Sequence, residues 1–114
     1  MSVKLTMRQV GDVTVIDAAG RITLGEGSSA FRDSIKDLVS KGSRKMLLNL
    51  AEVSYIDSSG IGELVSGFTT VSNAGGSLKL LNLTKRIQDL LQITKLYTIF
   101  EVFDDEAAAL ATFQ

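Results

Sequence analysis

The chain of 114 residues contains no cysteine, no histidine and no proline. The absence of cysteine excludes disulfides, thiolate nucleophiles and cysteine-bound metal sites. Without histidine, the chain lacks the usual general base near neutral pH and the commonest metal ligand, so it cannot form a serine–histidine–aspartate triad by itself. These absences disfavour most enzymatic functions, and we expect no catalytic residue, no metal and no cofactor. The absence of proline is unusual but carries no functional conclusion.

The chain also lacks a strong charge of either sign and lacks long hydrophobic runs. Its net charge is -1, from 12 basic and 13 acidic residues distributed along the sequence. No basic stripe is present that would neutralise a phosphate backbone, so nucleic-acid binding is not expected. No apolar run approaches the roughly 20 residues that span a bilayer, and the N-terminal segment lacks the apolar core of a signal peptide. We expect a cytoplasmic protein without a membrane partner, folded as one domain over residues 1–114.

The N-terminal part of the sequence predicts a β-hairpin. Residues 2–10 alternate polar and apolar side chains, residues 13–19 are rich in β-branched residues, and Gly11-Asp12 between them is typical of a tight turn. The predicted inward face of the first strand consists of Val3, Leu5 and Met7. Residues 20–29 then indicate a loop with three glycines, whose final serines are suited to cap a helix.

The rest of the sequence alternates between helical and strand patterns. Helices are predicted from Phe31 to Gly42, from Ser58 to Asn73, at 84–93 with Thr84 as its cap, and at 104–113. Strands are predicted at 45–50, 78–83 and 97–103, and the first of these is apolar enough to be buried on both faces. Strands and helices joined by short loops indicate right-handed crossovers. The sequence therefore predicts an α/β fold, with a mixed sheet, an N-terminal hairpin, parallel strand–helix–strand crossovers and helices packed on the sheet.

The second predicted helix has two contrasting faces. Its apolar residues recur with helical spacing and predict a buried face formed by Ile61, Leu64, Val65, Phe68 and Val71. The opposite face is small and uncharged apart from Glu63, and it consists otherwise of Ser59, Gly62, Ser66, Thr69, Thr70 and Asn73. Two interpretations remain open. These small residues are merely tolerated there or pack under a loop, or they form a low-profile surface on which another protein docks.

The start of this helix carries two adjacent serines in the segment YIDSSGIGEL. Asp57 is the predicted N-cap, and Ser58 and Ser59 fill the first turn. Backbone N–H groups and the helix dipole favour an anion at this position, so a phosphate on Ser58 is compatible with the fold. A hydrolase that uses Ser58 or Ser59 as nucleophile is disfavoured because the chain has no histidine. The glycines match no phosphate-binding loop, which disfavours nucleotide hydrolysis.

Residues 48–65, LNLAEVSYIDSSGIGELV, resemble the signature of the STAS domain, the family of bacterial anti-sigma factor antagonists. In that family, an Asp-Ser-[Ser/Thr]-Gly-[Leu/Ile]-Gly turn follows a buried strand and opens a helix. The resemblance continues in the Gly-Arg-Ile turn at residues 20–22, in GGSLKLLNLT at 75–84 and in the segment 90–110. It therefore extends over nearly the whole chain.

The resemblance implies a regulatory switch. It implies that Ser58 is phosphorylated by an anti-sigma factor with serine kinase activity, that the unphosphorylated form binds this partner and frees the sigma factor, and that a serine phosphatase reverses the modification. The implied motif residues are Asp57, Ser59, Gly60, Ile61 and Gly62. Thr23, in the turn after the second strand, and Ser66, on the small-residue face of the helix, are further expected docking residues. Thr23 replaces an acid that is common in the family. An alternative is a STAS interaction module in a stressosome-like scaffold, a two-component pathway or a motility output.

Overall fold

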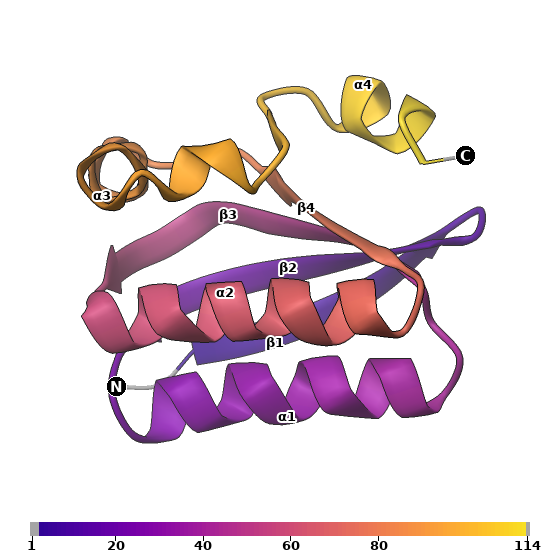
Figure 1. The fold of residues 1–114 in the computed structure, drawn as a ribbon, viewed down its shortest axis with the longest axis horizontal. Helices are drawn as coiled ribbons and strands as arrows, with labels where there is room; N and C mark the ends of the chain where they lie inside the picture. Colours follow the sequence, from indigo (N-terminus) through magenta and orange to yellow (C-terminus); the bar gives the residue numbers. More distant parts are fainter. Residues whose placement is uncertain (1–2, 114) are drawn as a thin grey trace.

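A five-stranded sheet forms the centre of the structure, a computed structural model that describes residues 3–113 (Figure 1). The strands are β1 (Val3–Val10), β2 (Val13–Ile22), β3 (Lys45–Ile56), β4 (Ser77–Leu81) and β5 (Val102–Phe103). They lie side by side in sequence order. β1 is antiparallel to β2, and all other neighbours are parallel. The predicted mixed sheet with an N-terminal hairpin is confirmed.

The helices divide between the two sides of this sheet. They are α1 (Glu26–Ser40), α2 (Ser58–Asn73), α3 (Lys85–Thr94), the 3-10 helix η1 (Leu96–Thr98) and α4 (Glu106–Ala111). In Figure 1, α1 and α2 lie below the sheet, and α3, η1 and α4 lie above it. The larger hydrophobic cluster contains Met46 and Leu48 of β3, whereas Leu47 belongs to a second cluster with Ala109 of α4. The prediction of a central strand buried on both faces is therefore confirmed.

The prediction of a loop at residues 20–29 is wrong at both ends of that range. Gly20 to Ile22 continue β2, because β3 is long enough to pair with them as far as Ile56. α1 then begins at Glu26 with Gly25 as its N-cap, and no side chain caps it. Gly25 has a φ of 98°, a conformation that favours glycine. The serines expected to cap the helix, Ser28 and Ser29, lie inside its first turns.

Two further predictions need correction. Met7 is 38% exposed and belongs to neither hydrophobic cluster, whereas Val3 and Leu5 pack on the larger one, so only part of the predicted face of β1 is covered. The predicted strand at 97–103 is mostly η1 and loop, and only Val102–Phe103 forms β5. The reason is that β5 pairs with β4 only through Leu80 and Leu81, at the end of β4.

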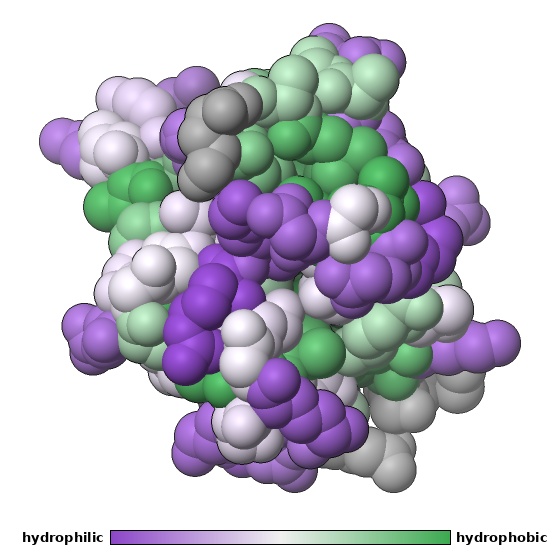
Figure 2. Space-filling model, turned by 90° about the vertical axis from the view of Figure 1, so that its right-hand side faces the viewer, coloured by the Kyte–Doolittle hydropathy of each residue, from purple (hydrophilic) through white to green (hydrophobic). Residues whose placement is uncertain are grey.

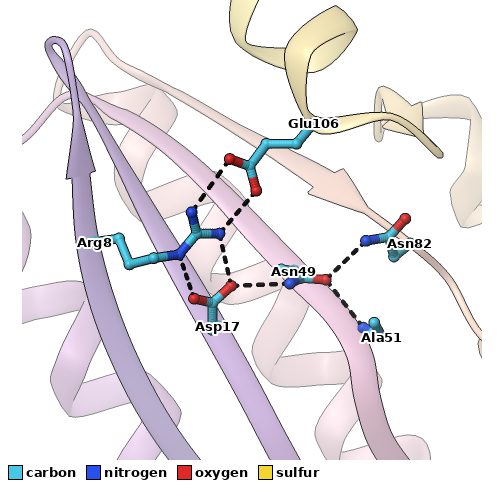
Figure 3. Close-up of polar contacts among 6 residues, drawn as sticks. All are labelled: Arg8, Asp17, Asn49, Ala51, Asn82 and Glu106. Carbon is cyan, nitrogen blue, oxygen red and sulfur yellow. Dashed lines mark hydrogen bonds and ion pairs between the residues drawn. The ribbon is translucent and has the colours of Figure 1, made fainter.

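A polar network crosses the sheet beneath α4 (Figure 3). The guanidinium of Arg8 on β1 donates to the carboxylate of Asp17 on β2, with Nε–Oδ2 at 2.5 Å, and to Glu106 of α4, with Nη2–Oε1 at 2.8 Å. Asn49 of β3 donates from Nδ2 to Asp17 at 2.9 Å and accepts a bond from Asn82 at 3.2 Å. The Arg8 hydrogen bonds lower the pKa of both the Asp17 and the Glu106 carboxyl groups. Arg8 thus joins the first residue of α4 to β1 and β2.

We expect Arg8→Gln to lower the free energy of unfolding by about 1 kcal/mol at pH 7, because the pairs are partly exposed and screened by water. The folded-state pKa values of Asp17 and Glu106 lie below their unfolded values. The contribution of these ion pairs to stability is therefore fully present above the unfolded-state pKa values of about 4. It is lost as the pH falls through the folded-state pKa values. Urea unfolding of both proteins between pH 7 and pH 2.5 measures this difference.

The control for the Arg8 variant is Lys85→Gln. Lys85 pairs with Asp89 at 2.9 Å along one helix, and the side chains are 84% and 54% exposed. Such a pair contributes at most about 0.5 kcal/mol, so this variant should unfold almost like the wild type. The role given to the network would be contradicted if Arg8→Gln lowered the free energy of unfolding no more than Lys85→Gln does. It would also be contradicted if the loss caused by Arg8→Gln did not diminish in acid.

The side of the sheet covered by α4 is only partly closed. Val10, Phe103 and Leu110 are partly buried residues that pack against the second cluster. Figure 2 shows the end of the molecule that carries the β1–β2 turn, where hydrophilic and hydrophobic residues mix and a broad hydrophobic area lies in the upper half.

Among the helices within residues 3–113, none has the length and apolar character of a membrane span.

Candidate functional site

The two serines lie at the end of the molecule where β2 and β3 finish and α1 and α2 begin (Figure 1, left). We call residues 57–60 the Ser58 turn. α3 lies at the same end of β3, on the side opposite α2. The carboxyl ends of neighbouring parallel strands meet at one edge of a sheet, and this is where α/β proteins place their functional loops.

Asp57 organises the Ser58 turn. As predicted, it is the N-cap of α2, and its Oδ1 accepts a hydrogen bond from Gly60 N at 2.9 Å. Its Oδ2 accepts a second bond, from Leu24 N at 3.3 Å in the β2–α1 loop. The bond from Gly60, followed by that from Leu24, lowers the pKa of the Asp57 carboxyl group. The ionised side chain therefore joins two loops that are far apart in the sequence.

The two serines differ in their surroundings. Ser58 is the first residue of α2 and is exposed, and its hydroxyl makes no hydrogen bond within residues 3–113. Ser59 is half-buried and lines a shallow hollow of about 410 Å³ between the starts of α1 and α2. The other residues that line this hollow are Leu24, Gly25, Ser28, Ser29, Arg32, Gly62 and Glu63. Of the two hydroxyls, that of Ser58 is the more accessible to another protein.

The two glycines of the motif have different physical roles. A Cβ on Gly60 would lie 2.2 Å from the carbonyl oxygen of Ile22 and 2.5 Å from Cγ1 of Ile56, so the close approach of α2 to β2 requires glycine. A Cβ on Gly62 would meet nothing within 4 Å. Between them, Ile61 is 5% exposed and belongs to the larger hydrophobic cluster. Gly60 and Ile61 therefore shape the turn, whereas Gly62 leaves the surface flat.

The small-residue face of α2 is open in the structure. Gly62, Ser66, Thr69 and Asn73 are all exposed. Glu63, the one long charged side chain on this face, is 16% exposed and pairs with Arg32 of α1 at 3.0 Å. Gly67 is explained by packing instead, because its Cβ position is 3.2 Å from the Phe31 ring. The face is therefore not packed under a loop. Exposure alone does not choose between small residues that are merely tolerated and a surface on which another protein docks.

The loop before α1 contains Leu24, which the sequence analysis did not single out, and Thr23, which it did. Leu24 is 80% exposed beside the Ser58 turn. Thr23 is half-buried, and its carbonyl oxygen accepts bonds from Ser28 N at 3.0 Å and Ser28 Oγ at 2.7 Å. The side chain of Thr23 makes no hydrogen bond within residues 3–113, so the residue acts here through its backbone. A lone leucine in a glycine-rich loop was the available sequence signal for Leu24, but sequence alone does not distinguish an exposed leucine from a buried one.

This geometry suits modification and docking. An exposed hydroxyl at a helix N-terminus, with the nearby carboxylate already engaged in capping, can carry a phosphate without disturbing the fold. The adjacent surface of small side chains lets another backbone approach closely. Within the described part of the chain, no group of three or more acidic side chains could hold a metal ion.

Comparisons with known proteins identify the family of this chain. The model of the STAS domain family matches residues 4–109. The chain is similar to the anti-sigma-B factor antagonist of Bacillus subtilis, with 32% identity over 102 residues, which cover 90% of this chain and 92% of that protein.

Solved structures show the same fold. A crystal structure of a Thermotoga maritima protein superposes with a TM-score of 0.89 at 24% identity and covers 96% of this chain and 93% of its own. The phosphorylated form of SpoIIAA, a Bacillus cell fate determinant, superposes with a TM-score of 0.74 at 20% identity. The match covers 95% of this chain and 97% of that chain. At these identities the structures establish the fold alone. Together with the family model and the Bacillus subtilis relative, they confirm the resemblance found in the sequence, and the chain belongs to the STAS domain family.

Proposed function

We propose that this protein is a cytoplasmic anti-sigma factor antagonist that is controlled by phosphorylation of Ser58 and is not itself an enzyme. The unphosphorylated form binds an anti-sigma factor that is also a serine kinase, and this binding releases the sigma factor. A serine phosphatase restores the binding form. The name of the Bacillus subtilis relative supports the antagonist function, and the structure of phosphorylated SpoIIAA shows that a protein of this fold exists in a phosphorylated form.

The observation that carries the proposal is the position of Ser58. Its hydroxyl is exposed at the first position of α2 and is free of hydrogen bonds within residues 3–113. It lies at the border of a surface that we call the docking surface, formed by Leu24, Ser59, Gly62, Ser66 and Thr69. A kinase that docks there meets an unobstructed serine.

Phosphorylation would change this border electrostatically. A phosphate adds about two negative charges and three acceptor oxygens beside the ionised Asp57. A partner that approaches the docking surface would then have to desolvate these charges, which opposes binding unless it supplies its own cations. The fold itself should persist, since the phosphate sits at the positive end of α2.

The test is a phosphorylation experiment with matched serine variants. The protein would be incubated with ATP and each kinase-type anti-sigma factor encoded in its source genome, and the modified residue would be located by mass spectrometry. We expect one phosphate on Ser58, no phosphate on Ser58→Ala, and normal modification of Ser59→Ala. Equal loss of phosphate in both variants, or modification elsewhere in the chain, would refute the assignment of Ser58.

A further inference from the structure

Two arginines flank one aromatic ring close to the Ser58 turn. The guanidinium carbon of Arg86, in the first turn of α3, lies 4.1 Å from the centroid of the Tyr55 ring. That of Arg21, on β2, lies 4.8 Å from the same centroid. Arg21 and Tyr55 are register partners on the neighbouring strands β2 and β3. The ring thus holds two cations together through cation–π contacts, although like charges repel.

Neither of these arginines has a carboxylate partner within residues 3–113. The side chain of Arg21 makes no hydrogen bond or ion pair there, and the side chain of Arg86 uses only Nε, which donates to Ile56 O at 3.3 Å. By contrast, Arg8 and Arg32 are paired with carboxylates, and Arg44 donates to two backbone carbonyl groups. The terminal N–H groups of Arg21 and Arg86 are therefore available to an anion, and the guanidinium fork suits a phosphate.

The cluster lies within reach of Ser58. Arg86 contacts the carbonyl group of Ile56, which is only two residues before Ser58, and consecutive Cα atoms lie about 3.8 Å apart. α3 and the start of α2 lie at the same end of β3, on opposite sides of the sheet (Figure 1). A phosphate extends the serine side chain further, and the arginine side chain has several rotatable bonds.

We propose that Arg86 and Arg21 form an intramolecular receptor for a phosphate carried by Ser58. This inference rests on the proposed function, since it concerns the phosphorylated form. The ligand class is a phosphomonoester dianion, held by the guanidinium groups on the α3 side of the Ser58 turn. The nearby Lys85 and Arg32 already pair with Asp89 and Glu63, whereas the side chains of Arg21 and Arg86 have no carboxylate partner among residues 3–113.

The receptor would solve a problem that phosphorylation creates. The new dianion stands next to the ionised carboxylate of Asp57, which caps α2 and binds the β2–α1 loop. These two negative groups repel each other. If the arginines draw the phosphate toward α3, the repulsion falls and the phosphate is held in one position. The phosphate still occupies the border of the docking surface.

The experiment installs phosphoserine at position 58 during translation and measures its second pKa by 31P NMR titration. Free phosphoserine has a second pKa of about 6, and nearby cations lower this value because they favour the dianion. We expect Arg21→Gln combined with Arg86→Gln to raise the second pKa by about 0.5 to 1 unit relative to the phosphorylated wild type. Arg86→Lys, which keeps the charge but not the fork, should give a smaller increase than Arg86→Gln.

The matched control is Arg44→Gln, which removes one arginine that is already bonded to the carbonyl groups of Val39 and Ser43. Its phosphate should titrate like that of the wild type. Folding of all variants is verified by circular dichroism. If the double variant, the control and the wild type then share the same second pKa, the proposed phosphate receptor is refuted. Since the phosphate is installed without a kinase, this result is independent of whether a partner phosphorylates Ser58.

Discussion

Gly60→Ala is expected to destabilise the fold strongly. The added Cβ would lie 2.2 Å from the carbonyl oxygen of Ile22, far inside van der Waals contact. That oxygen cannot move away easily, because Ile22 is fully buried, pairs with Ile56 and accepts a hydrogen bond from Asp57 N at 3.4 Å. α2 would have to shift from the sheet and open the core around Ile61. We expect a loss of at least about 3 kcal/mol, against a total of about 5–15 kcal/mol for a typical domain.

The matched control is Gly62→Ala, two residues further along the same helix. Its Cβ would meet nothing within 4 Å, and alanine is the better helix former by about 1 kcal/mol. We therefore expect this variant to be as stable as the wild type or slightly more stable. Urea unfolding followed by circular dichroism measures both variants. Similar midpoints for the two variants would show that the close approach of Gly60 to β2 is not what requires glycine.

The second large effect is expected on binding. Gly62→Arg should weaken the complex with the kinase-type anti-sigma factor by at least about 100-fold, which corresponds to about 3 kcal/mol. Gly62 is exposed at the centre of the proposed docking surface, between Ser59 and Ser66. A long charged side chain there keeps the partner's backbone at a distance and must be desolvated on binding. Folding should be unaffected, since the position faces open space.

Ser72→Arg serves as the control for this binding experiment. Ser72 is exposed near the end of α2 and lies off the small-residue face, so the same side chain is added outside the docking surface. Isothermal titration calorimetry with the anti-sigma factor identified by the phosphorylation experiment measures both affinities. Equal affinities for Gly62→Arg and Ser72→Arg would place the docking surface elsewhere on the molecule.

Local sequence patterns predicted much of the fold, because helix capping and the spacing of apolar residues depend on side chains only a few positions apart. The Asp57 and Thr84 caps each bond a backbone N–H three residues ahead, at Gly60 and Ile87. The apolar face of α2 follows from helical spacing. The same reasoning found the hairpin, the central strand that is buried on both faces and the small-residue face of α2. The family resemblance then distinguished Ser58 from Ser59, which local chemistry alone had not done.

The sequence by itself thus determined the elements, the capped start of α2, the serine motif and the exclusion of a histidine-based triad. Only the tertiary structure decided which residues lie near the start of α2 and the end of β3. The bond from Leu24 to Asp57 joins residues 33 positions apart, and the two arginines at Tyr55 come from β2 and α3. The unequal roles of Gly60 and Gly62 likewise depend on where Ile22 lies. The physical reason is that strand pairing brings these segments together. The hydrophobic periodicity of one segment predicts its own secondary structure but does not predict which other segment lies beside it.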